Sequence, residues 1–198
     1  MHPDSAFNWE DREAMRQLID GIGFGTLFAA TPEGPKVAHV PVVWNGDRLL
    51  FHIARRNALT PHLAGTTALF TVLGPDGYVS PDWYGLDHNQ VPTWNYLAVE
   101  VEGRVEPLDH NALVAQIDSL SAMQEARLAP KPAWTRAKMD DAAFGAMLRG
   151  ITGFALEVET WRGTAKLGQN KPAAARAAAA DALSAAGRPA IAQCMRRV

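Results

Sequence analysis

The segment from residue 24 to residue 74 holds a succession of short apolar runs separated by tight turns. The sequence Thr31–Pro35 is typical of a turn, and Asn45-Gly46 between two apolar runs is a strong hairpin signal. Successive strands joined in this way pair antiparallel, and they favour a small closed barrel over the parallel sheet of an alternating strand–helix chain. The strands predicted here cover residues 24–30, 36–44, 48–54 and 66–74.

Further elements flank this β-rich segment. Two more strands are predicted, at residues 96–108, where apolar and polar side chains alternate, and at residues 151–163. Helical periodicity predicts a first helix that Asn8 caps and Gly21 ends, and Thr60-Pro61 starts a short helix over 61–64. Two longer helices are predicted at residues 109–128 and 140–150.

The chain length predicts one domain with a small appendage. A chain of 198 residues can bury one substantial core. Residues 172–198 are rich in alanine and have high helix propensity, with few large side chains that could pack. The expected division is therefore a domain over 1–171 and a C-terminal helical tail over 172–198, with the tail at the surface or against a partner.

Composition excludes several classes of protein. The net charge of −2 argues against a broad basic face, so direct DNA binding is doubtful. Cys194 is the single cysteine, which excludes an internal disulfide and fits a reducing compartment. No apolar run approaches the ~20 residues that span a bilayer, and the acidic start is unlike a signal peptide. We therefore expect a cytoplasmic protein without a membrane segment.

Common cofactor motifs are also missing from the sequence. Gly21–Gly25 lacks the spacing of a dinucleotide fingerprint and precedes a strand instead of following one. The six histidines, at positions 2, 39, 52, 62, 88 and 110, are scattered without a carboxylate at ligand spacing, so no metal site is expected.

The end of the predicted strand 48–54 suits a phosphate group. His52, Arg55, Arg56 and Asn57 follow one another there, just before the capped turn at Thr60. Forked guanidinium donors beside helix-start amides are typical of phosphate recognition. A solvated loop that happens to contain two arginines is the alternative.

Residues 77–96 contain all three tyrosines and two of the six tryptophans of the chain. Flat apolar surfaces, among them Trp83, Tyr84 and Trp94, alternate with the hydrogen-bonding groups of Ser80, Asp82, Asn89, Thr93 and Asn95. A flat heterocycle with polar edges needs this combination. An aromatic core corner that carries a long loop is the alternative.

Several blocks of this sequence resemble one family. They are the His-Pro start, AHVPV at 38–42, FHIARRN at 51–57, YVSPDWY at 78–84, VPTWNY at 91–96 and KLGQNK at 166–171. In order and spacing they are similar to the PaiB family of FMN-binding negative transcriptional regulators, over about residues 2–171. The last 27 residues match no block of the family.

The resemblance implies a six-stranded FMN-binding split barrel of the α+β class with flanking helices, an obligate homodimer, and FMN at the dimer interface. By the same resemblance, His52, Arg55, Arg56 and Asn57 are expected at the FMN phosphate and ribityl chain. Ser80 and Trp83 would border the isoalloxazine ring, joined by Thr93, Trp94 and Asn95. The cofactor site would be closed by Lys166, Gln169 and Asn170, from the same subunit or from the other.

Three functions remain open at this point. The first is an FMN-binding regulator in which the state or occupancy of the flavin changes a partner interaction. The second is an FMN-dependent oxidoreductase that passes electrons from NAD(P)H to a small acceptor, in which the cofactor carries the chemistry. The third is a structural dimer with a vestigial flavin site.

Overall fold

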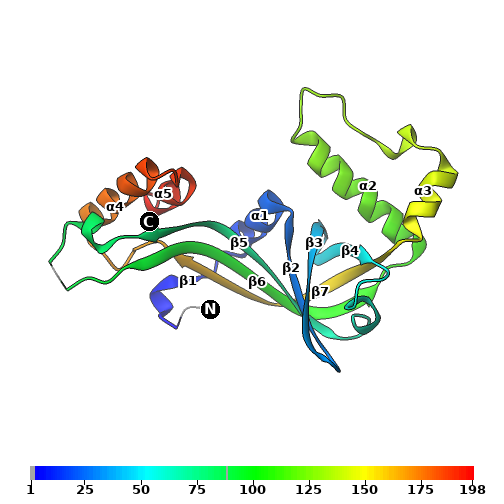
Figure 1. The fold of residues 1–198 in the computed structure, drawn as a ribbon, viewed down its shortest axis with the longest axis horizontal. Coiled ribbons are helices and arrows are strands. Elements are labelled where there is room, and N and C mark those ends of the chain that lie inside the picture. The colour runs from blue at the N-terminus through cyan, green and yellow to red at the C-terminus, as the bar shows by residue number, and fades with distance from the viewer. Residues whose placement is uncertain (1–2, 88) are drawn as a thin grey trace. The chain divides into compact units, whose positions relative to one another are not determined.

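The computed structural model describes residues 3–87 and 89–198. The strands are β1 (Asn8–Trp9), β2 (Phe24–Thr31), β3 (Gly34–Asn45), β4 (Arg48–Ala54), β5 (Thr67–Val79), β6 (Thr93–Pro107) and β7 (Ile151–Lys166), as Figure 1 shows. The helices are α1 (Arg12–Ile22), α2 (His110–Ala126), α3 (Asp141–Leu148), α4 (Ala173–Ala185) and α5 (Pro189–Met195). None of them combines the length and the apolar character needed to cross a bilayer, in the residues described.

The strands form one antiparallel sheet in the order β1-β7-β4-β3-β2-β5-β6. An additional pairing between β7 and β6 closes six of these strands into a ring, with the two-residue strand β1 outside it. Closure removes the unpaired strand edges that an open sheet would leave. The predicted fold class, a mainly antiparallel six-stranded split barrel with flanking helices, is confirmed.

The chain divides into two compact units that are described separately. We call residues Ile19–Thr71 and Val101–Trp161 the central unit. The residues up to Leu18, together with Val72–Glu100 and Arg162–Val198, are the terminal unit, since it contains both ends of the chain.

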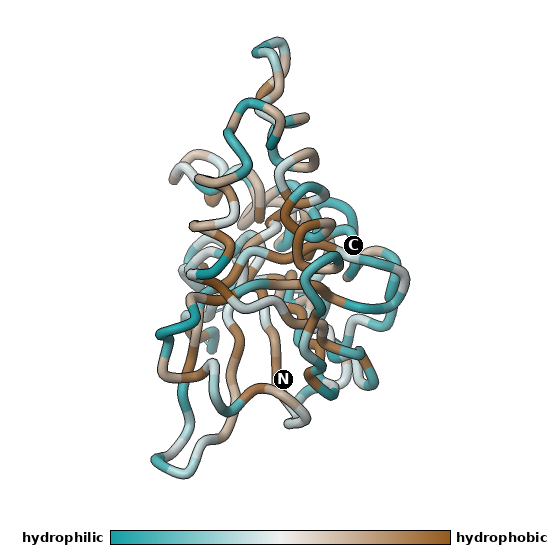
Figure 2. Tube along the Cα trace, turned by 90° about the vertical axis from the view of Figure 1, so that its right-hand side faces the viewer, coloured by the Kyte–Doolittle hydropathy of each residue, from teal (hydrophilic) through white to brown (hydrophobic). Residues whose placement is uncertain are grey.

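The hairpin of β3 and β4 in the central unit follows from its turn residues. Asn45 pairs with Arg48, so Gly46 and Asp47 form the two-residue turn, and Gly46 adopts the positive φ of 59° that this turn requires. Alternate side chains of the strands point inward, among them the fully buried Leu27, Leu49 and Phe51. Figure 2 shows the hydropathy along the trace, with apolar stretches in the strands and hydrophilic residues at turns.

Strands β6 and β7 come close together at Gly103 in the central unit. A Cβ atom at Gly103 would lie 1.8 Å from the carbonyl oxygen of Glu157, so no larger residue fits there without a shift of the backbone. Glycine is therefore required where the two strands meet, and it permits the pairing that closes the ring.

The C-terminal tail is part of the core of the terminal unit. Helices α4 and α5 lie side by side (Figure 1), and their buried residues Ala179, Leu183 and Ile191 join Val79 and Tyr84 in one apolar cluster. The expectation of a surface tail was wrong, because small alanine side chains let the helices approach the strands closely. Whether residues 1–171 fold without the tail stays a prediction.

The predicted elements exist, but several bounds differ. Helix α1 begins after Asp11, whose carboxylate accepts a hydrogen bond from the Ala14 amide, so Asp11 and not Asn8 is the cap. The helix runs through Gly21 and ends before Gly23, which has a φ of 66°. Strands β5 and β7 continue beyond their predicted ends to Val79 and Lys166, and β6 begins at Thr93.

Candidate functional site

The turn after β7 places several polar groups of the terminal unit together. Gly168 adopts a φ of 77°, a left-handed conformation that favours glycine. The Lys171 amide donates to the Gly168 carbonyl at 2.9 Å, which closes the turn just before α4. As a result Lys166, Asn170 and Lys171 all line the same pocket.

Strand β6 forms another wall of this pocket. Because side chains alternate along a strand, Thr93 and Asn95 lie on one face and Trp94 on the other. Thr93 and Asn95 line the pocket, and Asn95 is completely buried. Trp94 is 48% exposed on the opposite face, and its indole N–H donates to Asp76 Oδ1 at 3.1 Å.

The pocket has a volume of about 220 Å³ and lies within the terminal unit. We call it the lysine pocket. It brings together four residues predicted for the cofactor site, Thr93, Asn95, Lys166 and Asn170. The remaining lining residues are Asp4, Phe7, Tyr84, Val91, Gly168 and Lys171.

The two lysines of the lysine pocket are held by neutral groups. Lys166 Nζ donates to Thr93 Oγ1 at 2.7 Å and lies 5.6 Å from the centre of the Phe7 ring. Lys171 Nζ donates to Gln90 Oε1 at 2.6 Å and lies 5.4 Å from the centre of the Tyr84 ring. Within residues 3–87 and 89–198, neither ammonium group has a carboxylate partner.

Two buried polar atoms of the pocket wall lack a hydrogen bond of full geometry. They are the Tyr84 hydroxyl and Asn95 Oδ1, on side chains that are 3% and 0% exposed. The Asn95 amide nitrogen donates to Met195 Sδ at 3.3 Å, a weak acceptor. Burial raises the pKa of Tyr84, and hydrogen bonding to the nearby Asn95 side chain opposes that rise, although the geometry of the two groups falls short of a full hydrogen bond. The hydroxyl therefore keeps its proton at neutral pH.

Other predicted residues of the terminal unit have structural contacts. The Gln169 side chain accepts from the Leu167 amide and donates to the carbonyls of Ala165 and Ala6, so it clamps the turn. Trp83 packs on the apolar cluster beneath α4 and α5, and Ser80 precedes the short helical turn Pro81–Tyr84. None of these three lines the lysine pocket.

The predicted phosphate residues lie in the central unit. His52 Nδ1 is 3.0 Å from Gln116 Oε1, and burial lowers the pKa of His52. Arg55 donates to the carbonyls of Arg149 and Ile151, at 2.8 and 3.3 Å. The Asn57 side chain accepts from the Leu59 amide, and Arg56 is exposed. The role of these four residues at a cofactor stays a prediction.

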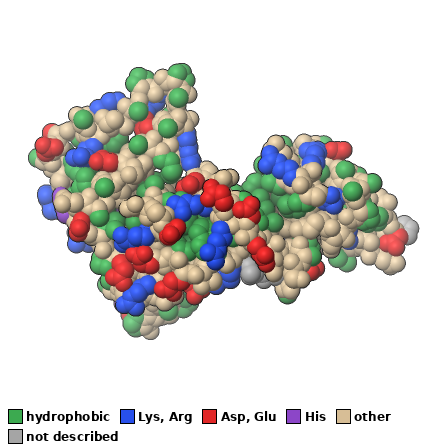
Figure 3. Space-filling model, turned by 180° about the vertical axis from the view of Figure 1, so that it is seen from behind, with side chains coloured by type: hydrophobic (Ala, Val, Ile, Leu, Met, Phe, Trp, Pro, Cys, Tyr) green, Lys and Arg blue, Asp and Glu red, His purple; other side chains and the backbone are tan. Residues whose placement is uncertain are grey.

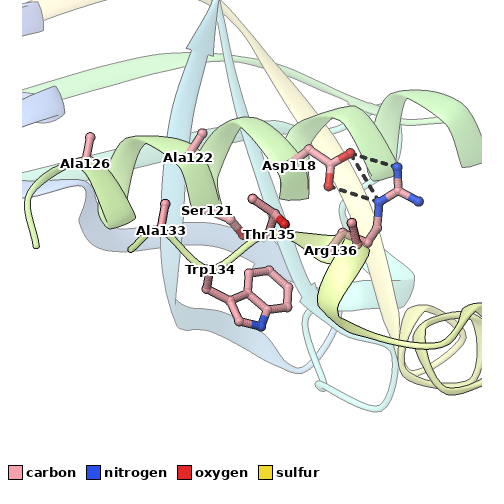
Figure 4. A pocket seen from close by; sticks show the side chains of 9 residues that line it. Asp118, Ser121, Ala122, Ala126, Ala133, Trp134, Thr135 and Arg136 are labelled. Atoms are coloured by element: carbon pink, nitrogen blue, oxygen red, sulfur yellow. Dashed lines mark hydrogen bonds and ion pairs between the residues drawn. The ribbon is translucent and has the colours of Figure 1, made fainter. Parts of the chain in front are cut away.

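The central unit has pockets of its own. One of about 330 Å³ is lined by apolar side chains and by five polar ones, Arg55, Asp109, His110, Arg149 and Thr152. Another, of about 390 Å³, lies between α2 and the segment 133–137 (Figure 4). Its Asp118 and Arg136 pair with each other, and alanines and Trp134 supply much of the remaining wall. Because its charged groups satisfy one another, this pocket offers little to a polar ligand.

Sequence reasoning named Tyr84 only as one of the aromatic surfaces that suit a heterocycle, and it did not assign Lys171, Asp4 or Phe7 to the site. Lys171 ends the KLGQNK block, and Tyr84 ends the YVSPDWY block, so the motifs contained a signal for both. Asp4 and Phe7 come from the segment before α1, where no pattern in the sequence indicated a pocket.

Comparison with known proteins identifies related sequences. A family described as "Putative FMN-binding domain" matches residues 1–160. The protein of Bacillus subtilis (strain 168) called "Protease synthase and sporulation protein PAI 2" is 27% identical over 176 residues, which is 86% of this chain and 83% of that protein. The resemblance to the PaiB family that the motifs indicated is confirmed.

Solved structures share the fold. An FAD and heme binding protein from Mycobacterium smegmatis matches with a TM-score of 0.60 at 21% identity, over 81% of this chain and 74% of that one. The flavocytochrome Anf3 from Azotobacter vinelandii also matches with a TM-score of 0.60, at 18% identity, over 85% of this chain and 73% of that one. At these identities the likeness shows the fold alone.

Proposed function

This chain belongs to the FMN-binding domain family and is related to PaiB, and we propose that it binds FMN in a site that includes the lysine pocket and that two copies complete. The observation that carries the proposal is the convergence of Thr93, Asn95, Lys166 and Asn170 on one pocket. These residues come from two distant blocks of the sequence, and the family resemblance predicted all four for the cofactor.

The chemistry of the lysine pocket fits a flavin cofactor. FMN offers ring carbonyls, ring nitrogens, ribityl hydroxyls and a phosphate. The ammonium groups of Lys166 and Lys171 and the Tyr84 hydroxyl are donors for such oxygens, and Asn95 Oδ1 is an acceptor for a flavin N–H or O–H. The partners that these buried atoms lack within the chain are groups that FMN can supply.

A second copy of the chain would supply the rest of the site. Pockets that enclose a whole small-molecule ligand usually measure about 300–1,000 Å³, and the lysine pocket measures about 220 Å³. On the face of β6 opposite the pocket, Trp94 is 48% exposed, and it contacts Tyr78, also 48% exposed, edge to face. Figure 3 shows further apolar side chains that reach the surface among charged ones. Such exposed aromatic groups are typical of interfaces.

A bound isoalloxazine ring would supply electron transfer, while the protein binds and orients it. A regulatory role of the PaiB type would then depend on the occupancy or redox state of the flavin. The net charge of −2 favours a signal that passes to a protein partner over direct reading of DNA.

Titration of the purified protein with FMN tests the proposal. We expect the visible absorbance band of FMN to shift and its fluorescence to be quenched as the flavin binds. Thr93→Val removes a pocket hydroxyl while keeping the shape, and it should weaken FMN by roughly two- to tenfold. The matched control Thr67→Val, on an exposed strand position, should leave FMN affinity unchanged. Absence of any flavin binding would refute the proposal.

A further inference from the structure

We propose that Lys166, Lys171 and the Tyr84 hydroxyl form an oxyanion subsite, which takes a phosphate or carboxylate group. The inference rests on the proposed function only in placing this subsite within the flavin site. The group could belong to FMN itself or to a second small molecule that binds beside the flavin.

The first observation that supports the subsite is the charge of the lysine pocket. Lys166 and Lys171 are partly buried and face the same pocket, yet each is held by a neutral oxygen and an aromatic ring. Their only acidic neighbour in the lining is Asp4, whose carboxylate accepts from the Ala6 amide. Two cations against one carboxylate leave the pocket with a positive balance, which an anion would neutralise.

The second observation that supports the subsite is the Tyr84 hydroxyl, which has no hydrogen bond of full geometry within the chain. Tyr84 is 3% exposed and lines the pocket, and the Asn95 side chain is a polar neighbour of its hydroxyl, but the geometry of the two groups falls short of a full hydrogen bond. A buried hydroxyl without a hydrogen bond is unfavourable, and native proteins rarely keep one without a reason. Because the hydroxyl stays protonated at neutral pH, it can donate a hydrogen bond to a ligand oxygen in the pocket that the two lysines also line.

The other basic side chains make a useful contrast. Arg162 pairs with Glu100 and Arg136 with Asp118, while Arg55 donates to backbone carbonyls. Those guanidinium groups already have anionic or carbonyl acceptors. In the lysine pocket, by contrast, the ammonium groups of Lys166 and Lys171 have no carboxylate partner among the described residues. The buried Tyr84 hydroxyl in the same pocket has no acceptor in full hydrogen-bond geometry.

The chain continues from this subsite directly into α4. Asn170 and Lys171 line the pocket, and Pro172 is the residue that precedes the first turn of the helix. The start of a helix carries a partial positive charge. This adds to the positive field of the two lysines and disfavours a cationic occupant.

The test compares Lys171→Gln with wild type in two assays on the full chain. The first measures the affinities of FMN and of riboflavin, which lacks the phosphate. The second measures the rise in melting temperature that inorganic phosphate, and separately acetate, produces in the flavin-free protein. Lys138→Gln is the charge-matched control, since Lys138 is exposed and donates to the Ala133 carbonyl. Lys171→Arg keeps the charge and should preserve much of the wild-type behaviour.

Two results support the subsite and identify the carrier of the anion. If the group is the flavin phosphate, Lys171→Gln weakens FMN roughly tenfold or more and leaves riboflavin unchanged. If the anion is a second molecule, both flavins bind as before, while the variant loses the stabilisation by phosphate or acetate. Lys138→Gln should change neither assay.

The subsite is overturned if Lys171→Gln weakens FMN and riboflavin equally, or if it leaves both assays unchanged. The proposed function is judged separately. Stabilisation by phosphate that depends on Lys171 in a protein that binds no flavin would keep the subsite and refute the FMN site. If the protein binds flavin and Lys171→Gln changes no assay, the FMN site is supported and the subsite is refuted.

Discussion

Tyr84 shows at the scale of one residue how a binding site can conflict with stability. Its ring packs in the apolar cluster of the terminal unit, which favours the folded chain. Its hydroxyl is buried without a hydrogen bond of full geometry, since Asn95 interacts with it only weakly, and this costs at most about 1–3 kcal/mol. A ligand oxygen that accepts a hydrogen bond from this hydroxyl would remove that cost. The burial of the hydroxyl in the folded chain therefore contributes to the free energy of ligand binding.

We therefore predict opposite effects of Tyr84→Phe on stability and on binding. Without ligand, the melting temperature should stay the same or rise, because the variant loses only a hydroxyl without a full hydrogen bond. The affinity for FMN, or for phosphate in the thermal assay, should fall roughly fivefold or more. Tyr96→Phe, at a partly buried tyrosine of the same unit that does not line the pocket, is the control and should change neither quantity. A clear loss of stability in ligand-free Tyr84→Phe would contradict this account.

At the scale of elements, α4 shows how a tail rich in alanine becomes part of a core. Ala175, Ala179 and Ala180 are buried, and Leu183 follows them one turn later on the same face. The opposite face of the helix is exposed. Small side chains allow close packing of the helix, so burial and not side-chain size determines the role of these residues.

Glutamate substitutions on the two faces of α4 test this packing. Ala179 is fully buried, so Ala179→Glu would bury a charge and should destabilise the terminal unit by about 3 kcal/mol or more. Ala178 is exposed in the same helix, so Ala178→Glu should change stability by less than about 0.5 kcal/mol. Denaturant unfolding measures both values. Equal, small effects would mean that the tail is a surface helix after all.

Closure of the strand ring depends on Gly103. A methyl group there would overlap the Glu157 carbonyl, so Gly103→Ala should cost more than about 3 kcal/mol or prevent folding. Gly21 is the contrasting position, because nothing lies within 4 Å of a Cβ added there inside α1. Gly21→Ala should stabilise the protein by about 0.5–1 kcal/mol. Thermal unfolding of the two variants distinguishes these outcomes, and a neutral Gly103→Ala would show that the strands separate easily.

At the scale of the whole molecule, the homodimer is the main expectation. Trp94 and Tyr78, at 48% exposure each, and Val91, at 76%, are large apolar groups near the lysine pocket that the single chain leaves uncovered. An obligate interface of about 2,000 Å² or more would bury such groups and complete a pocket that is small for FMN.

Light scattering on the purified protein tests this expectation. We predict twice the mass of one 21.5 kDa chain at micromolar concentration. Trp94→Glu places a charge on the exposed face of β6 and should shift the mass toward that of one chain. Ala178→Glu, at an exposed position of α4, controls for one added negative charge. A wild-type mass of one chain at every concentration would refute the dimer.

The sequence by itself determined the class of the fold and the elements that build it. Apolar runs with Asn45-Gly46 between them predicted antiparallel hairpins, because turn chemistry and alternation act over a few residues. The same local rules placed α2 and α3 within two residues of their observed bounds. The motif blocks identified the family, and four of the residues named from them converge on one pocket.

Only the tertiary structure decided the features that depend on contacts between distant segments. Pairing of β6 with β7 closes the ring, and burial against Val79 and Tyr84 makes a core helix of the alanine-rich tail. The lysine pocket likewise needs Asp4, Thr93 and Lys171 from three separate stretches of chain. Local patterns carry no information about which distant groups become neighbours, and that placement leaves the Tyr84 hydroxyl without a hydrogen bond of full geometry.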